Sequence, residues 1–401
     1  FGPHLHLDMI ESATGDYVDP LPFFMEKVKD NIAPRAEGII LFPQPGKGVV
    51  NGKQIHRTFP VNPTQPITAW GLIGAGIRAY DHMDGVGNRY GVHTVILEVD
   101  GEEVFRSVVD RFAYEENRYI NSWTHGQYMK SFIEPGNRLR MLHASNGNRG
   151  LVEINEERPY RFVYTLSDAL GNTSKVRFTV QGKNTEIHPV EHREKYAFKW
   201  DRTNYLQEPG LELVVPRGML YDDVWLDYSV RADSGDVAFT YQLHNKRVPL
   251  HGACEMRIGL RRDRLEDKSK YYVAGVTARG GKYSIGGTYE DGFMKVRIRD
   301  LGTYTVAVDT VPPEIIPLNP GQWGRTGRIT LKAKDKETGI NSYRGTIDGK
   351  YALFGKPNSI SGNLVCELDP KHVKKGGRHT VEMTVTDGRG NRTTEEFHFV
   401  W

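Results

Sequence analysis

The stretch from Tyr160 to Val180, YRFVYTLSDALGNTSKVRFTV, decides the fold class of this chain. Apolar residues alternate with polar ones on both sides of Asp168-Ala169-Leu170-Gly171-Asn172, which is the period of a half-buried β-strand. Glycine and asparagine tolerate the left-handed backbone that a tight turn between two strands requires. The stretch therefore predicts a β-hairpin.

A second copy of this device lies near the end of the sequence. The turn sequence Asp387-Gly388-Arg389-Gly390-Asn391 follows the alternating residues Val381, Met383 and Val385, and a further alternating run ends at Trp401. Two segments that end with the same strand, turn and strand resemble the last hairpin of bacterial immunoglobulin-like or fibronectin-like sandwiches.

Composition and length extend this prediction to the whole chain. With 401 residues, 43 glycines, 21 prolines and many short alternating runs, the chain is predicted to be all-β with about three cores. The alternating runs restart near Pro34, Lys183 and Pro312. We expect a β-sandwich at 31–183 with an insertion at about 105–150, a second sandwich at 184–310 and an immunoglobulin-like sandwich at 311–401.

Charge, cysteine content and hydropathy exclude several classes of function. The formal net charge is only +3 and the basic residues are scattered, so no nucleic-acid partner is indicated. No apolar run reaches the roughly 18 residues that a transmembrane helix needs. Cys254 and Cys366 fall in different predicted domains, so we expect both thiols to be unpaired.

The first residues contain a candidate metal site. In Phe1-Gly2-Pro3-His4-Leu5-His6-Leu7-Asp8, the polar residues alternate with apolar ones, which places His4, His6 and Asp8 on one face of a strand. Two imidazoles at this spacing can converge on one zinc ion, or one can bind zinc while its neighbour acts on the substrate.

This motif, followed by Asp19-Pro20-Leu21, resembles the end of the catalytic domain of lysostaphin/LytM-type zinc metallopeptidases, the peptidoglycan endopeptidases of bacterial cell envelopes. The resemblance covers about 25 residues and implies a Zn2+ cofactor, with His6 as a zinc ligand and His4 as the catalytic histidine. Asp8 stands where the family usually has glutamate, and its role as an acid that orients a ligand or supports the fold stays open.

The family's remaining zinc ligands, a His-x-x-x-Asp pair, lie upstream of this motif in its members. We therefore interpret residues 1–30 as the end of a peptidase domain and expect this chain alone to bind zinc weakly and to be inactive. The resemblance implies a cell-envelope location, periplasmic or exported, with a signal peptide upstream. It also implies peptidoglycan peptides as partners, with envelope proteins or glycans bound by the β-domains. The alternative is a non-catalytic envelope binding or scaffold protein with a vestigial peptidase edge.

Two further motifs favour structural interpretations. His188-Pro189-Val190-Glu191-His192 matches the inverted zinc-protease motif, but its proline and its interdomain position argue against the helix that such a site needs. Gly74-Ala75-Gly76 imitates a dinucleotide-binding loop, yet it lies within a strand-like run, where glycines allow a bulge or close backbone approach.

Two groups of residues leave a binding function open. Asp81, Asp84 and Asn88 could hold a calcium ion, although the spacing favours a polar turn. The insertion carries Tyr114, Tyr119, Trp123 and Tyr128, which could stack on sugars. Packing of these rings onto the host domain is the favoured interpretation.

Overall fold

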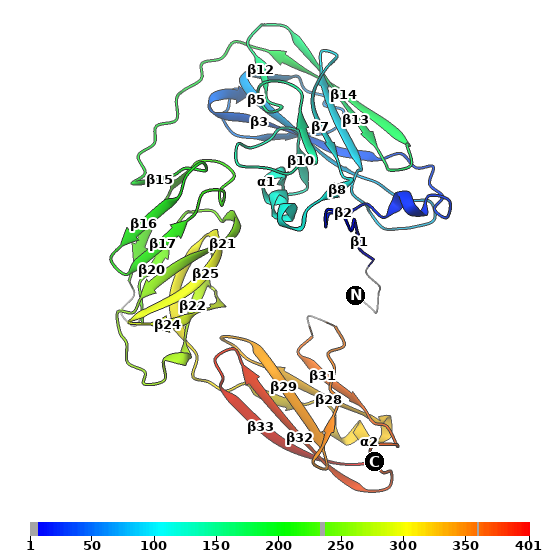
Figure 1. Cartoon of the computed structure of the whole chain (residues 1–401), viewed down its shortest axis with the longest axis vertical. Coiled ribbons are helices and arrows are strands. Elements are labelled where there is room, and N and C mark those ends of the chain that lie inside the picture. Colours follow the sequence, from blue (N-terminus) through cyan, green and yellow to red (C-terminus); the bar gives the residue numbers. More distant parts are fainter. Residues whose placement is uncertain (1–6, 233–236, 359–360) are drawn as a thin grey trace.

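The computed structural model describes residues 7–232, 237–358 and 361–401. Nearly all of its regular structure is β-strand, which confirms the predicted fold class. Three β-rich domains follow one another in an open arc (Figure 1), and each contains its own hydrophobic core.

All strands of the first domain's main body belong to one connected sheet of 11 strands. These strands are β3 (Arg35–Val50), β4 (Arg57–Phe59), β5 (Ile67–Tyr80), β6 (Thr94–Val99), β7 (Glu102–Val108), β9 (Thr124–His125), β10 (Tyr128–Lys130), β11 (Leu142–Ala144), β12 (Val152–Ile154), β13 (Pro159–Ser167) and β14 (Thr173–Gly182). Strands β3 and β5 are 16 and 14 residues long, and β5 pairs with four different strands along its length. One long strand can therefore connect ladders that would otherwise form separate sheets.

The hairpin predicted from the sequence joins β13 and β14. These strands pair in antiparallel register from Pro159 opposite Gln181 to Ser167 opposite Thr173. Between them, the amide of Asp168 donates a hydrogen bond to the carbonyl of Asn172 (3.1 Å), and Gly171 has a φ of +94°. Local alternation and turn chemistry were thus sufficient to predict this element.

The insertion contains the two short helices η2 (Tyr114–Tyr119) and α1 (Ile120–Trp123), so its partly helical character is confirmed. Trp123 is buried in the host domain and donates its indole hydrogen bond to the Lys130 carbonyl (3.1 Å). Tyr119 instead stacks on His251 of the second domain, with ring centroids 4.0 Å apart. The insertion therefore packs onto its host and also contacts the neighbouring domain.

The second domain is a sandwich of two five-stranded sheets with an additional two-stranded pair. Its strands are β15 (Tyr196–Phe198), β16 (Asn204–Glu208), β17 (Leu211–Val215), β18 (Val224–Leu226), β19 (Ser229–Arg231), β20 (Thr240–Gln242), β21 (Val248–Gly259), β22 (Tyr271–Val276), β23 (Lys282–Gly286), β24 (Thr288–Glu290), β25 (Phe293–Leu301) and β26 (Thr303–Val308), with the short helix η3 (Lys268–Lys270) before β22. One sheet has the order β16-β17-β21-β25-β24 and the other β19-β20-β26-β22-β23. Their facing apolar side chains form the core.

The third domain is a smaller sandwich of a three-stranded and a four-stranded sheet. It consists of β27 (Glu314–Pro317), η4 (Pro320–Gln322), α2 (Trp323–Thr326), β28 (Arg328–Lys334), β29 (Ile340–Ile347), β30 (Lys350–Ala352), β31 (Asn363–Glu367), β32 (Arg378–Asp387) and β33 (Arg392–Val400). Cys366 on β31 and Cys254 on β21 are both buried and unpaired, as predicted.

The turn between β32 and β33 also contacts the second domain. Arg389 donates hydrogen bonds from its guanidinium to the carbonyls of Tyr271 (2.9 Å) and Gly287 (3.1 Å). In return, the Lys270 ammonium donates to the Arg389 carbonyl (2.9 Å). The same turn therefore closes a hairpin of the third domain and holds the junction with the second.

Candidate functional site

The N-terminal segment is part of the first domain's surface. Its strands β1 (Met9–Ile10) and β2 (Tyr17–Val18) pair with each other, and β2 pairs with β8 (Arg111–Phe112) of the insertion. A short helix, η1 (Leu21–Phe24), follows. His4 and His6 lie outside the described residues, whereas Asp8 is exposed beside β1.

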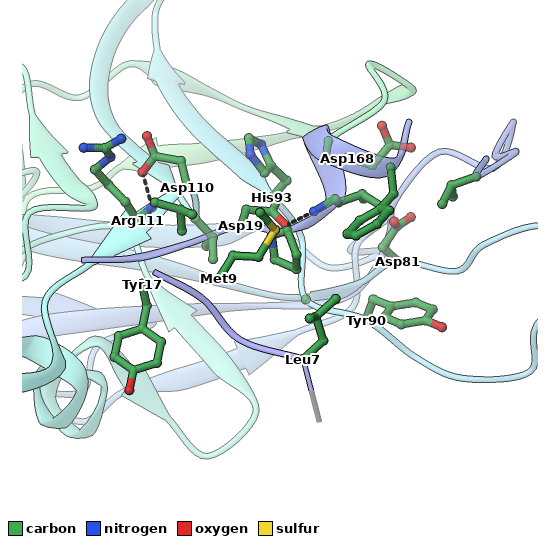
Figure 2. A pocket seen from close by; sticks show the side chains of 18 of the residues that line it. Leu7, Met9, Tyr17, Asp19, Asp81, Tyr90, His93, Asp110, Arg111 and Asp168 are labelled. Carbon is green, nitrogen blue, oxygen red and sulfur yellow. Dashed lines mark hydrogen bonds between the residues drawn. The ribbon is translucent and has the colours of Figure 1, made fainter. Parts of the chain in front are cut away.

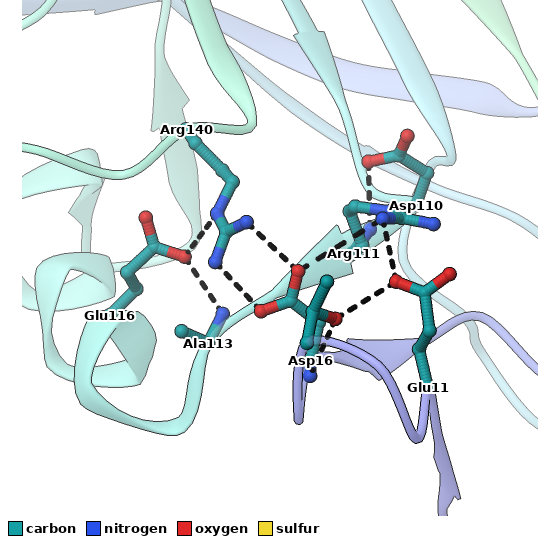
Figure 3. A network of polar contacts seen from close by, with 8 residues as sticks. Glu11, Asp16, Asp110, Arg111, Ala113, Glu116 and Arg140 are labelled. Carbon is teal, nitrogen blue, oxygen red and sulfur yellow. Dashed lines mark hydrogen bonds and ion pairs between the residues drawn. The ribbon is translucent and has the colours of Figure 1, made fainter.

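A network of charged side chains fixes this segment to the insertion (Figure 3). Asp16 is 3% exposed and accepts two hydrogen bonds from the Arg140 guanidinium, at 2.8 and 2.9 Å. The same guanidinium donates from Nε to Glu116 (2.8 Å), and Arg111 donates to Glu11 (3.1 Å). Because a buried carboxylate is stable only when it is paired, this network holds the N-terminal segment in place.

A pocket of about 660 Å³ lies between the N-terminal segment and the first domain (Figure 2). Its apolar walls come from both parts and include Met9, Leu21, Phe24, Val28, Met83, Val92, Val109 and Phe112. The N-terminal segment also exposes large apolar side chains, among them Leu7, Ile10, Phe23 and Met25. Exposed apolar side chains beside an apolar pocket are typical of a binding site.

Acidic side chains gather at one end of this pocket. Asp30, Asp81 and Asp168 each offer a carboxylate oxygen within 4.8 Å of the other two. Figure 2 labels Asp81 and Asp168, which lie at the same side of the pocket. Asp81 is 4% exposed and its Oδ1 has no hydrogen-bond partner, so burial raises its pKa to about 6.

The other two carboxylates are partly engaged by the backbone. Asp168 Oδ1 accepts hydrogen bonds from the amides of Leu170 and Asn172, both at 2.9 Å. Asp30 Oδ1 accepts from the amide of Ile32 (3.0 Å), while its Oδ2 is buried without a partner. Asp168 is thus hydrogen-bonded by its own turn, whereas Asp30 and Asp81 each retain a carboxylate oxygen without a donor.

The calcium candidate predicted from the sequence has a different composition in the structure. Asp84 accepts a hydrogen bond from the side chain of Asn31 (2.8 Å), and the carbonyl of Asn88 contacts the His82 ring (2.7 Å). Neither residue joins the carboxylate group around Asp81. The polar-turn interpretation therefore holds for Asp84 and Asn88, whereas Asp81 belongs to a cluster that local spacing could not reveal.

A second cluster repeats this arrangement at the junction of the second and third domains. Asp309, Asp335 and Asp387 also lie with carboxylate oxygens within 4.8 Å of one another. In both clusters an asparagine side chain bridges the turn and the linker: Asn172 donates to Asp168 (2.7 Å) and to the Asp30 carbonyl (3.1 Å). The corresponding bonds from Asn391 go to Asp387 (2.7 Å) and to the Asp309 carbonyl (3.0 Å).

The second cluster has additional protein donors at Asp309 and Asp335. Thr338 donates its hydroxyl to Asp309 (2.5 Å). Asp335 Oδ2 accepts hydrogen bonds from the amides of Glu337 (3.1 Å), Thr338 (2.8 Å) and Gly339 (2.6 Å). The carboxylates of the second cluster are therefore more fully hydrogen-bonded than those of the first, although burial and the neighbouring Asp335 and Asp387 raise the pKa of Asp309.

The remaining histidine and glycine motifs have structural roles. His192 stacks on Trp225 with ring centroids 3.6 Å apart, and His188 is exposed beside Glu186, in a linker without a helix. Within the described residues, neither histidine belongs to a group that could hold a metal ion. A Cβ on Gly74 would lie 2.5 Å from the Phe132 ring, which confirms that this strand needs glycine for close packing.

Sequence reasoning missed Asp30 and Asp168 as site residues. A usable signal was present, because each Asp-x-x-Gly-Asn turn has a matching aspartate directly before the linker that leads into its domain. The signal becomes informative only when the turn and the linker are known to be neighbours in space.

Comparison with known proteins gives one family match. Residues 195–309 match the model of a Zu5-like domain, which covers the second domain. The comparison with curated protein sequences gives no match. In the described parts of the chain, no helix is both long enough and apolar enough to cross a membrane.

Solved structures give only distant similarity. A Bacteroides ovatus protein of the mixed-linkage glucan utilization locus, solved with a heptasaccharide, is 11% identical with a TM-score of 0.14, over 92% of this chain and 70% of that chain. A Ca2+-stabilized ice-binding adhesin of an Antarctic bacterium is 11% identical with a TM-score of 0.16, over 89% and 99%. Human Desmocollin-1 is 11% identical with a TM-score of 0.17, over 81% and 64%. The family match lies within the middle domain, which is similar to Zu5-like domains.

Proposed function

We propose that this chain is a non-catalytic binding or scaffold protein of the cell envelope, which holds a protein partner through the apolar pocket of its first domain. The pocket walls and the exposed apolar side chains of residues 7–30 support this proposal. An apolar protein segment would bury these side chains from water, which is the main driving force of most protein association.

The composition of the groups that could hold a metal ion supports a binding role. Within the described residues, both such groups contain aspartates only. A catalytic zinc site instead combines nitrogen ligands, or nitrogen and carboxylate ligands, with one open position for water. The described β-domains therefore offer carboxylate oxygens for binding.

Two assays test this function. The 401-residue protein should release no soluble peptides from purified peptidoglycan, with or without a chelator, and should bind the apolar dye ANS at the pocket. Met83→Asp and Val28→Asp should reduce dye fluorescence by about half or more, because each places a charge in the pocket wall. Leu353→Asp is the matched control, since Leu353 is 73% exposed in the third domain.

The protein partner is tested by co-sedimentation with an envelope fraction. Binding should fall in the two pocket variants and stay unchanged in the control variant. Chelator-sensitive hydrolysis by the wild-type chain, or equal binding by all variants, would contradict the proposal.

A second candidate is a zinc endopeptidase that cleaves peptidoglycan cross-links and of which this chain forms the carboxy-terminal part. The resemblance of the first 25 or so residues to the end of that family's catalytic domain supports it. In a longer protein with the missing ligands, His6→Ala should abolish tight zinc binding. His4→Ala should leave zinc bound and abolish turnover.

A further inference from the structure

Three parts of the chain that are distant in sequence bring their carboxylates together in the first domain. Asp30 precedes β3, Asp81 follows β5, and Asp168 begins the turn between β13 and β14. Three negative charges within 4.8 Å of one another repel each other strongly, because the side chains of Asp81 and Asp168 are buried. Such an arrangement needs a positive partner.

The described protein does not supply that partner. Among the described residues, none of the ion pairs includes one of these three carboxylates. Asp81 is 4% exposed, and its Oδ1 has no hydrogen-bond partner. The buried Oδ2 of Asp30 also lacks a hydrogen-bond partner. Buried carboxylate oxygens without a donor are costly and therefore rare.

We propose that Asp30, Asp81 and Asp168 bind a calcium ion. The ligands fit a hard cation, because all three are carboxylates and neither histidine nor cysteine takes part. Calcium needs six to eight oxygen ligands, and water can supply the remaining ones, since Asp81 and Asp168 also line the open pocket (Figure 2).

The bound ion joins the N-terminal segment to the body of the first domain. Asp30 lies at the end of the segment that carries η1 and the pocket residue Val28, whereas Asp168 belongs to the continuously paired hairpin of β13 and β14. Calcium therefore orders one wall of the pocket, and its removal releases the connection around Lys27 and Lys29, which are exposed.

The third domain contains a built-in control for this proposal. Asp335 carries three backbone amide donors and Asp309 carries a threonine hydroxyl. Because these protein donors occupy carboxylate oxygens that a cation would need, whereas Asp81 and Asp30 each keep a buried oxygen without a donor, we assign calcium to the first cluster.

Isothermal titration of calcium chloride into chelator-treated 401-residue protein tests the assignment. The wild type should bind one calcium ion per chain. Asp81→Asn and Asp30→Asn should each weaken binding by about tenfold or more, because each removes one of three charged ligands. Asp335→Asn should bind calcium as the wild type does. Absence of binding in the wild type, or an equal loss in Asp335→Asn, would overturn the proposal.

Limited proteolysis with lysyl endopeptidase gives a second readout. Calcium should slow cleavage after Lys27 and Lys29 in the wild type and in Asp335→Asn, because the ion holds the connection against the domain. In Asp81→Asn, calcium should leave the cleavage rate unchanged. If calcium protects Asp81→Asn as strongly as the wild type, the ion binds elsewhere and the assignment is wrong.

Discussion

The two aspartate clusters share one scaffold but differ in how their negative charge is compensated. In both, an Asp-x-x-Gly-Asn turn binds its own backbone and its asparagine reaches the linker before the domain. In the third domain, hydroxyl and amide donors complete the cluster, whereas Asp81 in the first domain keeps an unpartnered oxygen. The same turn and linker arrangement thus forms a hydrogen-bonded junction before the third domain and leaves carboxylate oxygens free to bind a cation in the first domain.

The largest expected effect concerns the part that both clusters share. Asp387→Ala removes the acceptor for the amides of Arg389 and Asn391 and for the Asn391 side chain. The buried donors left behind should destabilise the third domain by about 4 kcal/mol. Urea unfolding that is monitored by fluorescence of the buried Trp323 measures this loss.

Asp168→Ala should destabilise the first domain to a similar extent, because it removes the equivalent acceptors for Leu170 and Asn172. A loss below about 1 kcal/mol in either variant would show that the turn does not depend on its aspartate.

The second prediction separates the two clusters by the sign of the change in stability when one aspartate is replaced. In chelator-treated protein at pH 7.5, Asp81→Asn should stabilise the first domain by about 2 kcal/mol, because the pKa of Asp81 is raised to about 6 and its ionised form is disfavoured by burial. Asp335→Ala should instead destabilise the third domain by about 2 kcal/mol, since three amides lose their acceptor.

The dependence on pH checks the cause. Between about pH 4 and pH 6 the folded state holds a proton on Asp81 that the unfolded state has lost, so wild-type stability falls as the pH rises through this window. The gain from Asp81→Asn should therefore vanish below about pH 4. A gain that is independent of pH would point to packing and not to charge.

The smallest expected effect concerns the junction between the first two domains, which contains no residue of either aspartate cluster. Burial lowers the pKa of His251, whose ring stacks on Tyr119. Protonation therefore favours separation, and the contact should weaken by less than about 1 kcal/mol as the pH falls below the ordinary histidine range. Proteolysis of the linker at 184–195 at pH 7.5 and pH 5.5 measures this.

His251→Phe keeps an aromatic ring at this contact and removes the titrating group. Its linker should be cleaved at the same rate at both pH values, whereas cleavage of the wild type should be faster at the lower pH. Equal acid sensitivity in both proteins would assign the effect to another group.

The fold class and the two terminal hairpins could be predicted from sequence because their determinants are local. Alternation around Asp168-Ala169-Leu170-Gly171-Asn172 and the turn residues themselves specify the strands. The same holds for Gly74, where a strand pattern argued against a nucleotide loop and the structure shows a close ring contact.

The candidate cation site could not be predicted in this way, because its three ligands come from a linker, a strand end and a turn. Sequence spacing grouped Asp81 with Asp84 and Asn88. The bridge between Asp81 and Tyr90, and the pairing of β6 with β13 that places Thr94 opposite Ser167, bring Asp81 towards Asp168 instead. The peptidase interpretation stays a prediction, since His4 and His6 lie outside the described residues.

The contact that Arg389 makes with the second domain has a mechanical consequence. Its guanidinium and the Lys270 ammonium form charge-assisted hydrogen bonds across the junction in both directions. Bending at this junction must break several of these bonds at once, so the last two domains should move as one stiff unit under tension. The equivalent turn position in the first domain is Leu170, which has no such donor. The turn of the first domain therefore adds no comparable stiffness to its own linker.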